Sequence, residues 1–182
     1  MSAVVDVLVV VAGLVVLAWY LSWTATRLDR LHGRTEGAWA ALDAQLLRRS
    51  STAHELASSG LLDPASALLL AAAALEARQC PSGRRELAES DLSQALRAAV
   101  GDAGTTTALR VEPVGAQLLD EVSEATERVV LARSFYNDAV TSTRALRAKR
   151  VVRWFRLAGH AEVATPFDMD DLPPGASSRL VS

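Results

Sequence analysis

The stretch Leu118–Leu146, LLDEVSEATERVVLARSFYNDAVTSTRAL, has the most regular hydrophobic pattern in the chain. Apolar and small residues recur there at alternating steps of four and three, which places them on one stripe of a helix. This spacing is typical of the seam along which two long helices pack. We therefore predict a helix from about Pro113 to about Arg150 with the seam Leu118, Val122, Ala125, Val129, Ala132, Tyr136, Ala139, Thr143 and Leu146.

A second amphipathic run supplies the partner helix. It extends from Thr24 to about Ser59, and Gly60 follows as a residue that can take the left-handed conformation at a helix end. Its apolar positions share one face and are Leu28, Leu31, Ala38, Leu42, Leu46, Ala53 and Leu56. We expect the two long helices to lie side by side.

Two shorter helices are predicted between the long ones. Asp63 and Pro64 form a helix start, and the apolar helix of about 16 residues that follows is expected to be largely buried. The next helix covers residues 84–100, and the segment GDAGTTTALRVEP, residues 101–113, is expected to be a loop because it is rich in Gly and Thr. Apolar residues that mark the inner face of the 84–100 helix are Leu87, Leu92, Leu96 and Val100.

The first segment, Ala3–Trp23, reads AVVDVLVVVAGLVVLAWYLSW and has one charge, Asp6. About 20 predominantly apolar residues are needed to cross a bilayer, so the length fits. Trp19, Tyr20 and Trp23 cluster at one end, where aromatic rings anchor a helix at the headgroup level. A cleaved signal peptide is the alternative, but it normally has basic residues before the apolar run, and none is present here. A retained anchor is therefore favoured.

Charge next to the span predicts its orientation. Arg27, Arg30 and Arg34 follow the span, and basic residues concentrate on the cytoplasmic side of a membrane helix. We expect a single-pass protein of the cell membrane with its N-terminus outside and its helical domain in the cytoplasm.

These elements together predict an all-α protein. An N-terminal transmembrane helix continues into an antiparallel bundle of two long helices and a short helical hairpin. The predicted domains are the anchor at residues 1–23, the helical bundle at residues 24–160 and a flexible tail at residues 161–182, which contains several prolines and small polar residues.

The segment RVVRWFR, residues 150–156, combines basic and aromatic side chains. Such a combination suits contact with an anionic membrane surface. The alternative is a hydrophobic plug that closes the end of the bundle. Residues of the candidate membrane contact are Arg150, Arg153, Trp154, Phe155 and Arg156.

Several classes of chemistry find no support in the sequence. The formal net charge of −2 supplies no basic field for nucleic acid, and the single Cys80 excludes an internal disulfide framework. The segment HELAS, residues 54–58, has serine where a zinc-protease helix needs its second histidine. No phosphate-binding glycine loop is present, and the carboxylates lie among arginines, as on a solvated face. We therefore expect no metal, no cofactor, no small-molecule substrate and no catalysis by this chain.

The stretch ARSFYNDAV, residues 132–140, has the aromatic, amide and acidic side chains of a possible active site, but it lies on the predicted seam. Opposite it lies EGAWAALDAQLLRR, residues 36–49. We predict that Tyr136 or Asn137 forms a hydrogen bond with Asp43 or Gln45, which fixes the register of the helix pair. Residues expected to set this packing are Trp39, Leu42, Asp43, Gln45, Leu46, Ala132, Phe135, Tyr136, Asn137 and Ala139.

The same residues carry a family resemblance. An N-terminal span, AWAALDAQLLRR, DLSQAL and ARSFYNDAV occur in an order and spacing that resemble the LemA family of bacterial membrane proteins, over roughly residues 3 to 160. The segments GDAGTTTALRVEP and RVVRWFRLAGHAEVATPF depart from the family pattern. The resemblance implies a membrane-anchored helical bundle with a small external N-terminus, and it implies no reaction.

The sequence thus favours a membrane-anchored interaction or scaffold protein without catalysis, whose partner is another protein or a second copy of the chain. Two alternatives stay open. One is a lipid- or envelope-sensing module that contacts the membrane through residues 150–156, and the other is a non-catalytic subunit of a membrane enzyme.

Overall fold

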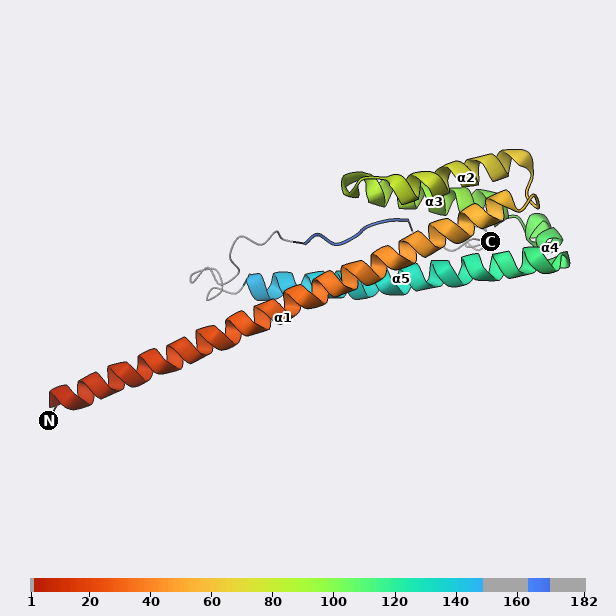
Figure 1. Cartoon of the computed structure of the whole chain (residues 1–182). Helices are drawn as coiled ribbons and strands as arrows, with labels where there is room; N and C mark the ends of the chain where they lie inside the picture. The colour runs from red at the N-terminus through yellow and green to blue at the C-terminus, as the bar shows by residue number, and fades with distance from the viewer. Residues whose placement is uncertain (1, 149–163, 171–182) are drawn as a thin grey trace, which may run out of the picture. The chain divides into compact units, whose positions relative to one another are not determined.

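The computed structural model describes residues 2–148 and 164–170 and is all-helical in these ranges, without a strand (Figure 1). This confirms the predicted all-α class. The chain order of the elements is α1 Ser2–Ser58, α2 Pro64–Gln79, the short 3-10 turn η1 Ser82–Arg84, α3 Arg85–Val100, α4 Ala103–Val111 and α5 Pro113–Arg147.

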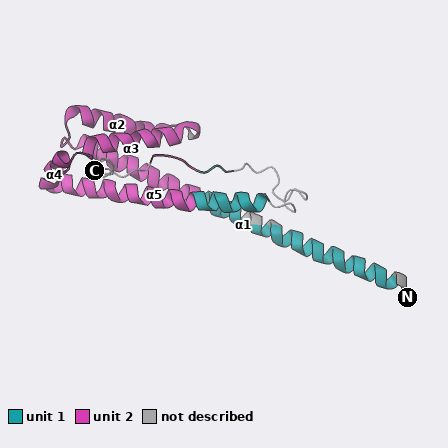
Figure 2. Ribbon diagram, turned by 180° about the vertical axis from the view of Figure 1, so that it is seen from behind, with its two compact units in different colours: residues 1–38, 137–166 teal, residues 39–136, 167–182 magenta. Residues whose placement is uncertain are grey.

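The chain divides into two compact units, which Figure 2 colours separately. Unit 1 comprises residues 1–38 and 137–166, and unit 2 comprises residues 39–136 and 167–182. The helices α1 and α5 contribute to both units, whereas α2, α3 and α4 belong to unit 2. The predicted boundaries at residues 23 and 160 fall inside unit 1.

The start of α1, in unit 1, is the predicted membrane span. Residues Val4–Thr24 are long and apolar enough to cross a bilayer. The valines and leucines from Val4 to Leu17 are all exposed, as are Trp19, Tyr20 and Trp23. At the end of the span the rings of Tyr20 and Trp23 lie 6.5 Å apart, and the guanidinium of Arg27 lies 5.7 Å from the Trp23 ring. The described residues therefore contain one helix that is long and apolar enough to span a membrane.

The second part of unit 1 pairs α1 with the end of α5. The hydroxyl oxygens of Thr35 and Thr143 lie 3.0 Å apart and are buried. Each hydroxyl also contacts a carbonyl of its own helix, Leu31 for Thr35 and Ala139 for Thr143, at 2.9 Å. The predicted seam residues of α5 in this unit are buried: Ala139, Thr143 and Leu146.

Unit 2 contains the main hydrophobic core. In it, α2 and α3 lie side by side as a hairpin (Figures 1 and 2). All five α-helices contribute to the core, together with Leu62 from the α1–α2 connection. Core residues are Ala53, Leu56, Ala57, Leu62, Leu70, Ala74, Ala77, Leu92, Leu96, Ala99, Val100, Leu109, Leu119 and Val122.

The turn between α1 and α2 follows the predicted chemistry. Gly60 has a φ of +76°, a conformation that costs glycine little because it has no Cβ. The Asp63 carboxylate then accepts hydrogen bonds from the backbone N–H groups of Ala65 and Ser66, both at 3.1 Å, and Pro64 opens α2.

Two predictions about the hairpin were wrong. The helix α2 is not largely buried, because it covers the core with one face only, through Leu70, Ala74 and Ala77. Its Leu68 is 71% exposed, and Leu69 and Leu75 are exposed as well. On α3, Leu87 faces outward, whereas Leu92, Leu96 and Val100 are buried as predicted.

The expectation of a loop at residues 101–113 was also wrong, since α4 lies there. Its cap explains the difference: the Asp102 carboxylate accepts a hydrogen bond from the Thr105 N–H at 2.9 Å. Gly101 allows the tight connection, because a Cβ at this position would lie 2.2 Å from the Arg97 carbonyl oxygen. Leu109 is buried and holds α4 against the core.

The segment Ala164–Asp170 departs from the predicted flexible tail. It has no helix or strand, yet Phe167 is only 4% exposed and Met169 only 7%. The candidate membrane contact, residues 150–156, lies outside the described residues, so its two interpretations stay predictions.

Adjacent residues of α5 provide a test of the seam. Tyr136 is 6% exposed and Phe135 is 64% exposed. We expect Tyr136→Ala to lower the free energy of unfolding by about 3–5 kcal/mol, because it removes a buried ring. Phe135→Ala, the matched control, should change it by no more than about 0.5 kcal/mol. Urea unfolding of both variants measures the difference, and equal losses would contradict the observed orientation of α5.

Candidate functional site: a buried charge cluster and a docked segment

Two helices of unit 2 carry a charge where the pattern calls for an apolar side chain. On α1, Arg49 falls between Leu46 and Ala53 in the same alternating spacing and is 1% exposed. On α3, Glu89 precedes Leu92 in the corresponding stripe and is fully buried. Opposite charges at seam positions are the signal in the sequence that predicts this pair, and we missed it because we expected carboxylates that lie among arginines to be solvated.

The two charges meet directly. The Arg49 Nη2 donates to Glu89 Oε2 at 2.6 Å and also to the Glu89 backbone carbonyl at 3.1 Å. The Arg49 Nη1 donates to Ser93 Oγ at 3.1 Å, and this hydroxyl donates in turn to the Glu89 carbonyl at 3.0 Å. One guanidinium therefore ties α1 to two successive turns of α3.

A second ion pair flanks the first. The Arg85 Nη2 lies 2.7 Å from Asp43 Oδ1, and Arg85 Nε lies 3.9 Å from Glu89 Oε1. Asp43, which we predicted to bond Tyr136 or Asn137, is thus bound by Arg85 of α3, and its predicted hydrogen bond to α5 stays a prediction. The other predicted acceptor, Gln45 Oε1, is buried without a hydrogen-bond partner in the described part of the chain. The sequence could not reveal Arg85 as the partner, because the two positions are 42 residues apart.

The electrostatics of the charge cluster are dominated by burial. Loss of solvent raises the pKa of Glu89 above the ordinary value of 4.5, and the nearby guanidiniums of Arg49 and Arg85 only partly offset this. A raised carboxyl pKa can mark an active site. Here Glu89 is covered on all sides, so a substrate cannot reach it, and we interpret the cluster as a device that fixes register.

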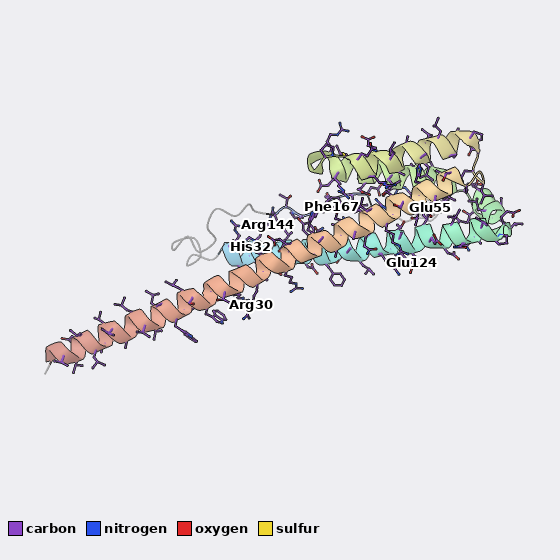
Figure 3. All side chains as sticks on the ribbon, in the orientation of Figure 1. Arg30, His32, Glu55, Glu124, Arg144 and Phe167 are labelled. Atoms are coloured by element: carbon purple, nitrogen blue, oxygen red, sulfur yellow. The ribbon has the colours of Figure 1, made fainter. Side chains whose placement is uncertain are left out.

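An aromatic contact lies at the start of the unit-2 part of α1. The Trp39 ring lies 5.3 Å from the Tyr136 ring of α5 and 5.8 Å from the Phe167 ring, measured between centroids. Figure 3 labels Phe167 on the extended segment. Trp39 and Tyr136, which are both among the predicted packing residues, are thus in contact, and Phe167 packs against Trp39 as well.

The other predicted packing residues divide by exposure. Leu42, Leu46 and Ala139 are buried, Ala132 and Asn137 are half-buried, and Phe135 is exposed. Phe135 therefore contributes an outward ring rather than a core contact.

The segment that carries Phe167 is fixed by polar contacts to α3. The Asp168 N–H donates to Glu86 Oε1 at 2.9 Å, and the Asp170 N–H donates to Ser90 Oγ at 3.1 Å. The Arg97 guanidinium binds both oxygens of the Asp170 carboxylate, with Nη1 to Oδ1 at 3.2 Å. Arg133 of α5 adds a weaker ion pair, 3.8 Å from Asp168 Oδ1.

Unit 2 also has a surface hollow where α3, α4 and α5 meet. It is lined by Val100, Thr106, Arg110, Leu119, Val122, Ser123, Thr126 and Glu127. Arg110 and Glu127 are its charged residues, so it offers no pair of acids for acid–base chemistry. In the described ranges no three metal-binding side chains converge.

Comparisons of the chain with protein-family models, with curated proteins and with solved structures find no match. The resemblance to the LemA family stays a prediction.

The charge cluster makes a prediction about stability. Arg49→Met should lower the free energy of unfolding by about 3–5 kcal/mol, because it leaves Glu89 buried without its partner. The double variant Arg49→Met/Glu89→Leu should recover most of that loss, since both desolvated charges are then absent and Arg85 keeps Asp43. Chemical unfolding of the single and double variants measures the cycle. Additive losses would show that the two residues do not interact.

The raised pKa of Glu89 predicts a pH dependence. Below pH 4.5 the carboxyl is protonated in folded and unfolded chains alike, and its full contribution to stability is present. As pH rises through the folded-state pKa, that contribution is lost. Wild type should therefore become less stable relative to Glu89→Gln, which cannot ionise, as pH increases from 4.5 towards neutrality.

Urea unfolding of both proteins at a series of pH values measures this difference, and groups common to both cancel in it. A constant difference, or one that favours wild type as pH rises, would contradict the raised pKa.

Proposed function

We propose that this protein is a membrane-anchored helical interaction protein that binds other proteins and catalyses no reaction of its own. The observation that carries the proposal is apolar surface that unit 2 leaves uncovered. On α2, the face opposite the core bears Leu68 and Leu75 one above the other, two turns apart, with Leu69 at its edge. A helix with leucine on its outer as well as its inner face normally packs against something on both sides.

The candidate span supports the membrane part of the proposal. The exposed apolar stretch Val4–Thr24 belongs to the same helix, α1, that later supplies Leu42, Leu46 and Leu56 to the buried interior. Side chains project outward along this part of α1 in Figure 3. Valine and leucine in such number are stable only out of water, and a bilayer supplies that environment.

The proposal also includes the orientation of the protein in the membrane and its resemblance to the LemA family. Arg27, Arg30 and Arg34 favour a cytoplasmic helical domain and an external N-terminus. The order of the span, AWAALDAQLLRR and ARSFYNDAV favours a LemA-like protein. Both points are independent of which partner binds.

Crosslinking of the full-length protein in its native membrane tests the proposal. We expect the protein in the membrane fraction and a discrete crosslinked complex with a partner protein or with further copies of itself. Leu68→Gln/Leu75→Gln should abolish this complex, because it removes apolar area from the outer face of α2. Val111→Gln/Val114→Gln is the matched control, since both valines are exposed elsewhere in unit 2.

Two results would contradict the proposal. Recovery of the wild-type protein from the soluble fraction would exclude the anchor. An unchanged crosslinking pattern in Leu68→Gln/Leu75→Gln would exclude α2 as the binding face.

A further inference from the structure

The segment Phe167–Asp170 is bound by unit 2 in the way that an extended peptide ligand is bound. Phe167 and Met169, two residues apart, are buried, while Asp168 between them has an exposed side chain. Alternation of this kind is how an extended chain presents one face to a surface. The segment therefore presents the aromatic and apolar side chains of Phe167 and Met169 to unit 2 and the Asp168 side chain to solvent.

The spacing of α3 matches the spacing of the segment. The N–H groups of Asp168 and Asp170 are accepted by Glu86 and Ser90, which are one helical turn apart. Two residues of extended chain span roughly 6.6 Å, and four residues of helix span roughly 6 Å. Successive inward N–H groups of an extended peptide thus meet successive turns of α3. Backbone contacts of this type hold any sequence, so the side chains must supply the selectivity.

Charge supplies part of that selectivity. Both Nη atoms of Arg97 donate hydrogen bonds to the Asp170 carboxylate, and Arg133 lies near Asp168. Bidentate arginine–carboxylate contacts favour an acid with a defined position and orientation. Trp39 provides the aromatic contact for Phe167. We name these five residues, Trp39, Glu86, Ser90, Arg97 and Arg133, the acceptor surface.

We propose that the acceptor surface is a binding site for a partner protein's extended peptide with the pattern aromatic–Asp–apolar–Asp, and that the chain's own Phe167–Asp170 occupies it until such a partner arrives. The segment then acts as a built-in competitor that sets a threshold for partner binding. This inference rests on the proposed interaction function for one point, that the ligand belongs to another protein.

A partner fits this surface better than a second copy of the chain does. A tethered segment acts at an effective concentration of the order of millimolar. An identical segment from a second copy has the same contacts and no such advantage, so it cannot displace the local one at ordinary concentrations. A partner peptide can differ, for example with tryptophan in place of Phe167, and so bind more tightly.

The test uses the full chain in detergent and a fluorescent peptide of residues 164–170, Ala-Thr-Pro-Phe-Asp-Met-Asp. The variant Phe167→Ala/Met169→Ala removes the two buried side chains of the chain's own segment, so that this segment no longer occupies the acceptor surface. We call it the emptied variant. We expect this variant to bind the peptide saturably, and wild type to bind it at least about tenfold more weakly because its own segment competes. A peptide with Ala in place of Phe and Met has the same charge and should not bind.

A second pair of variants tests the arginine contact. In the emptied background, Arg97→Gln should weaken peptide binding about tenfold or more, because the bidentate contact is lost. Arg78→Gln, on an exposed arginine of α2, is the control and should leave binding unchanged. Failure of the emptied variant to bind, equal binding by wild type, or equal effects of the two arginine variants would overturn the inference.

A third measurement does not depend on the folding of the emptied variant. A protease site placed within residues 149–163 of the wild-type chain allows the segment to be cut free after folding. The C-terminal fragment should stay with the bundle and be displaced by excess peptide. Loss of the fragment without competitor, or its retention against excess peptide, would overturn the inference.

A dimer of uncut wild type that is abolished by Phe167→Ala/Met169→Ala would assign the acceptor surface to a second copy and would also overturn the inference. None of these measurements depends on a membrane or on the outer face of α2. The inference about the acceptor surface can therefore be overturned while the proposed function stands, and the reverse also holds.

Discussion

The contact between Arg49 and Glu89 is the constraint on which the arrangement of unit 2 depends. Both side chains are buried, and neither has water to solvate its charge. Taking such charges out of water is costly unless they meet in good geometry, so α1 and α3 have one relative position in which the guanidinium reaches Glu89 Oε2, the Glu89 carbonyl and Ser93 Oγ together. An apolar seam of leucine and alanine would tolerate a slip by one turn, whereas this contact does not.

That register has consequences further along α3. The same helix that presents Glu89 inward presents Glu86, Ser90 and Arg97 on the face that holds the extended segment. If α3 were rotated or shifted, the spacing between the segment's N–H groups and their acceptors would be lost. The buried charges thus position the surface to which residues 167–170 bind, although they touch none of those residues in any contact described above.

The protein also has more apolar surface than its own core covers. The stretch Val4–Thr24 and the outer leucines of α2 are exposed, and they differ in kind. The first is apolar all round, which suits a bilayer. The second is one face of a helix whose opposite face is in the core, which suits another protein. The proposal of an anchored interaction protein rests on this difference between the two exposed surfaces.

The sequence by itself predicted α1, α2, α3 and α5, because their signals are local, and it missed only the short α4 among the α-helices of the described residues. The seam of α5, the Gly60 turn, the Asp63–Pro64 start and the candidate span all depend on residues within a few turns of one another. Only the tertiary structure decided which charges are buried and what they meet: Arg85 with Asp43, Arg49 with Glu89, and Arg97 with Asp170. These pairs join residues 40 or more positions apart, and a charge on a helix looks the same in sequence whether water or another helix faces it. The same reason explains why residues 164–170 read as a tail: Phe167–Asp170 becomes a bound segment only when α1, α3 and α5 supply the surface.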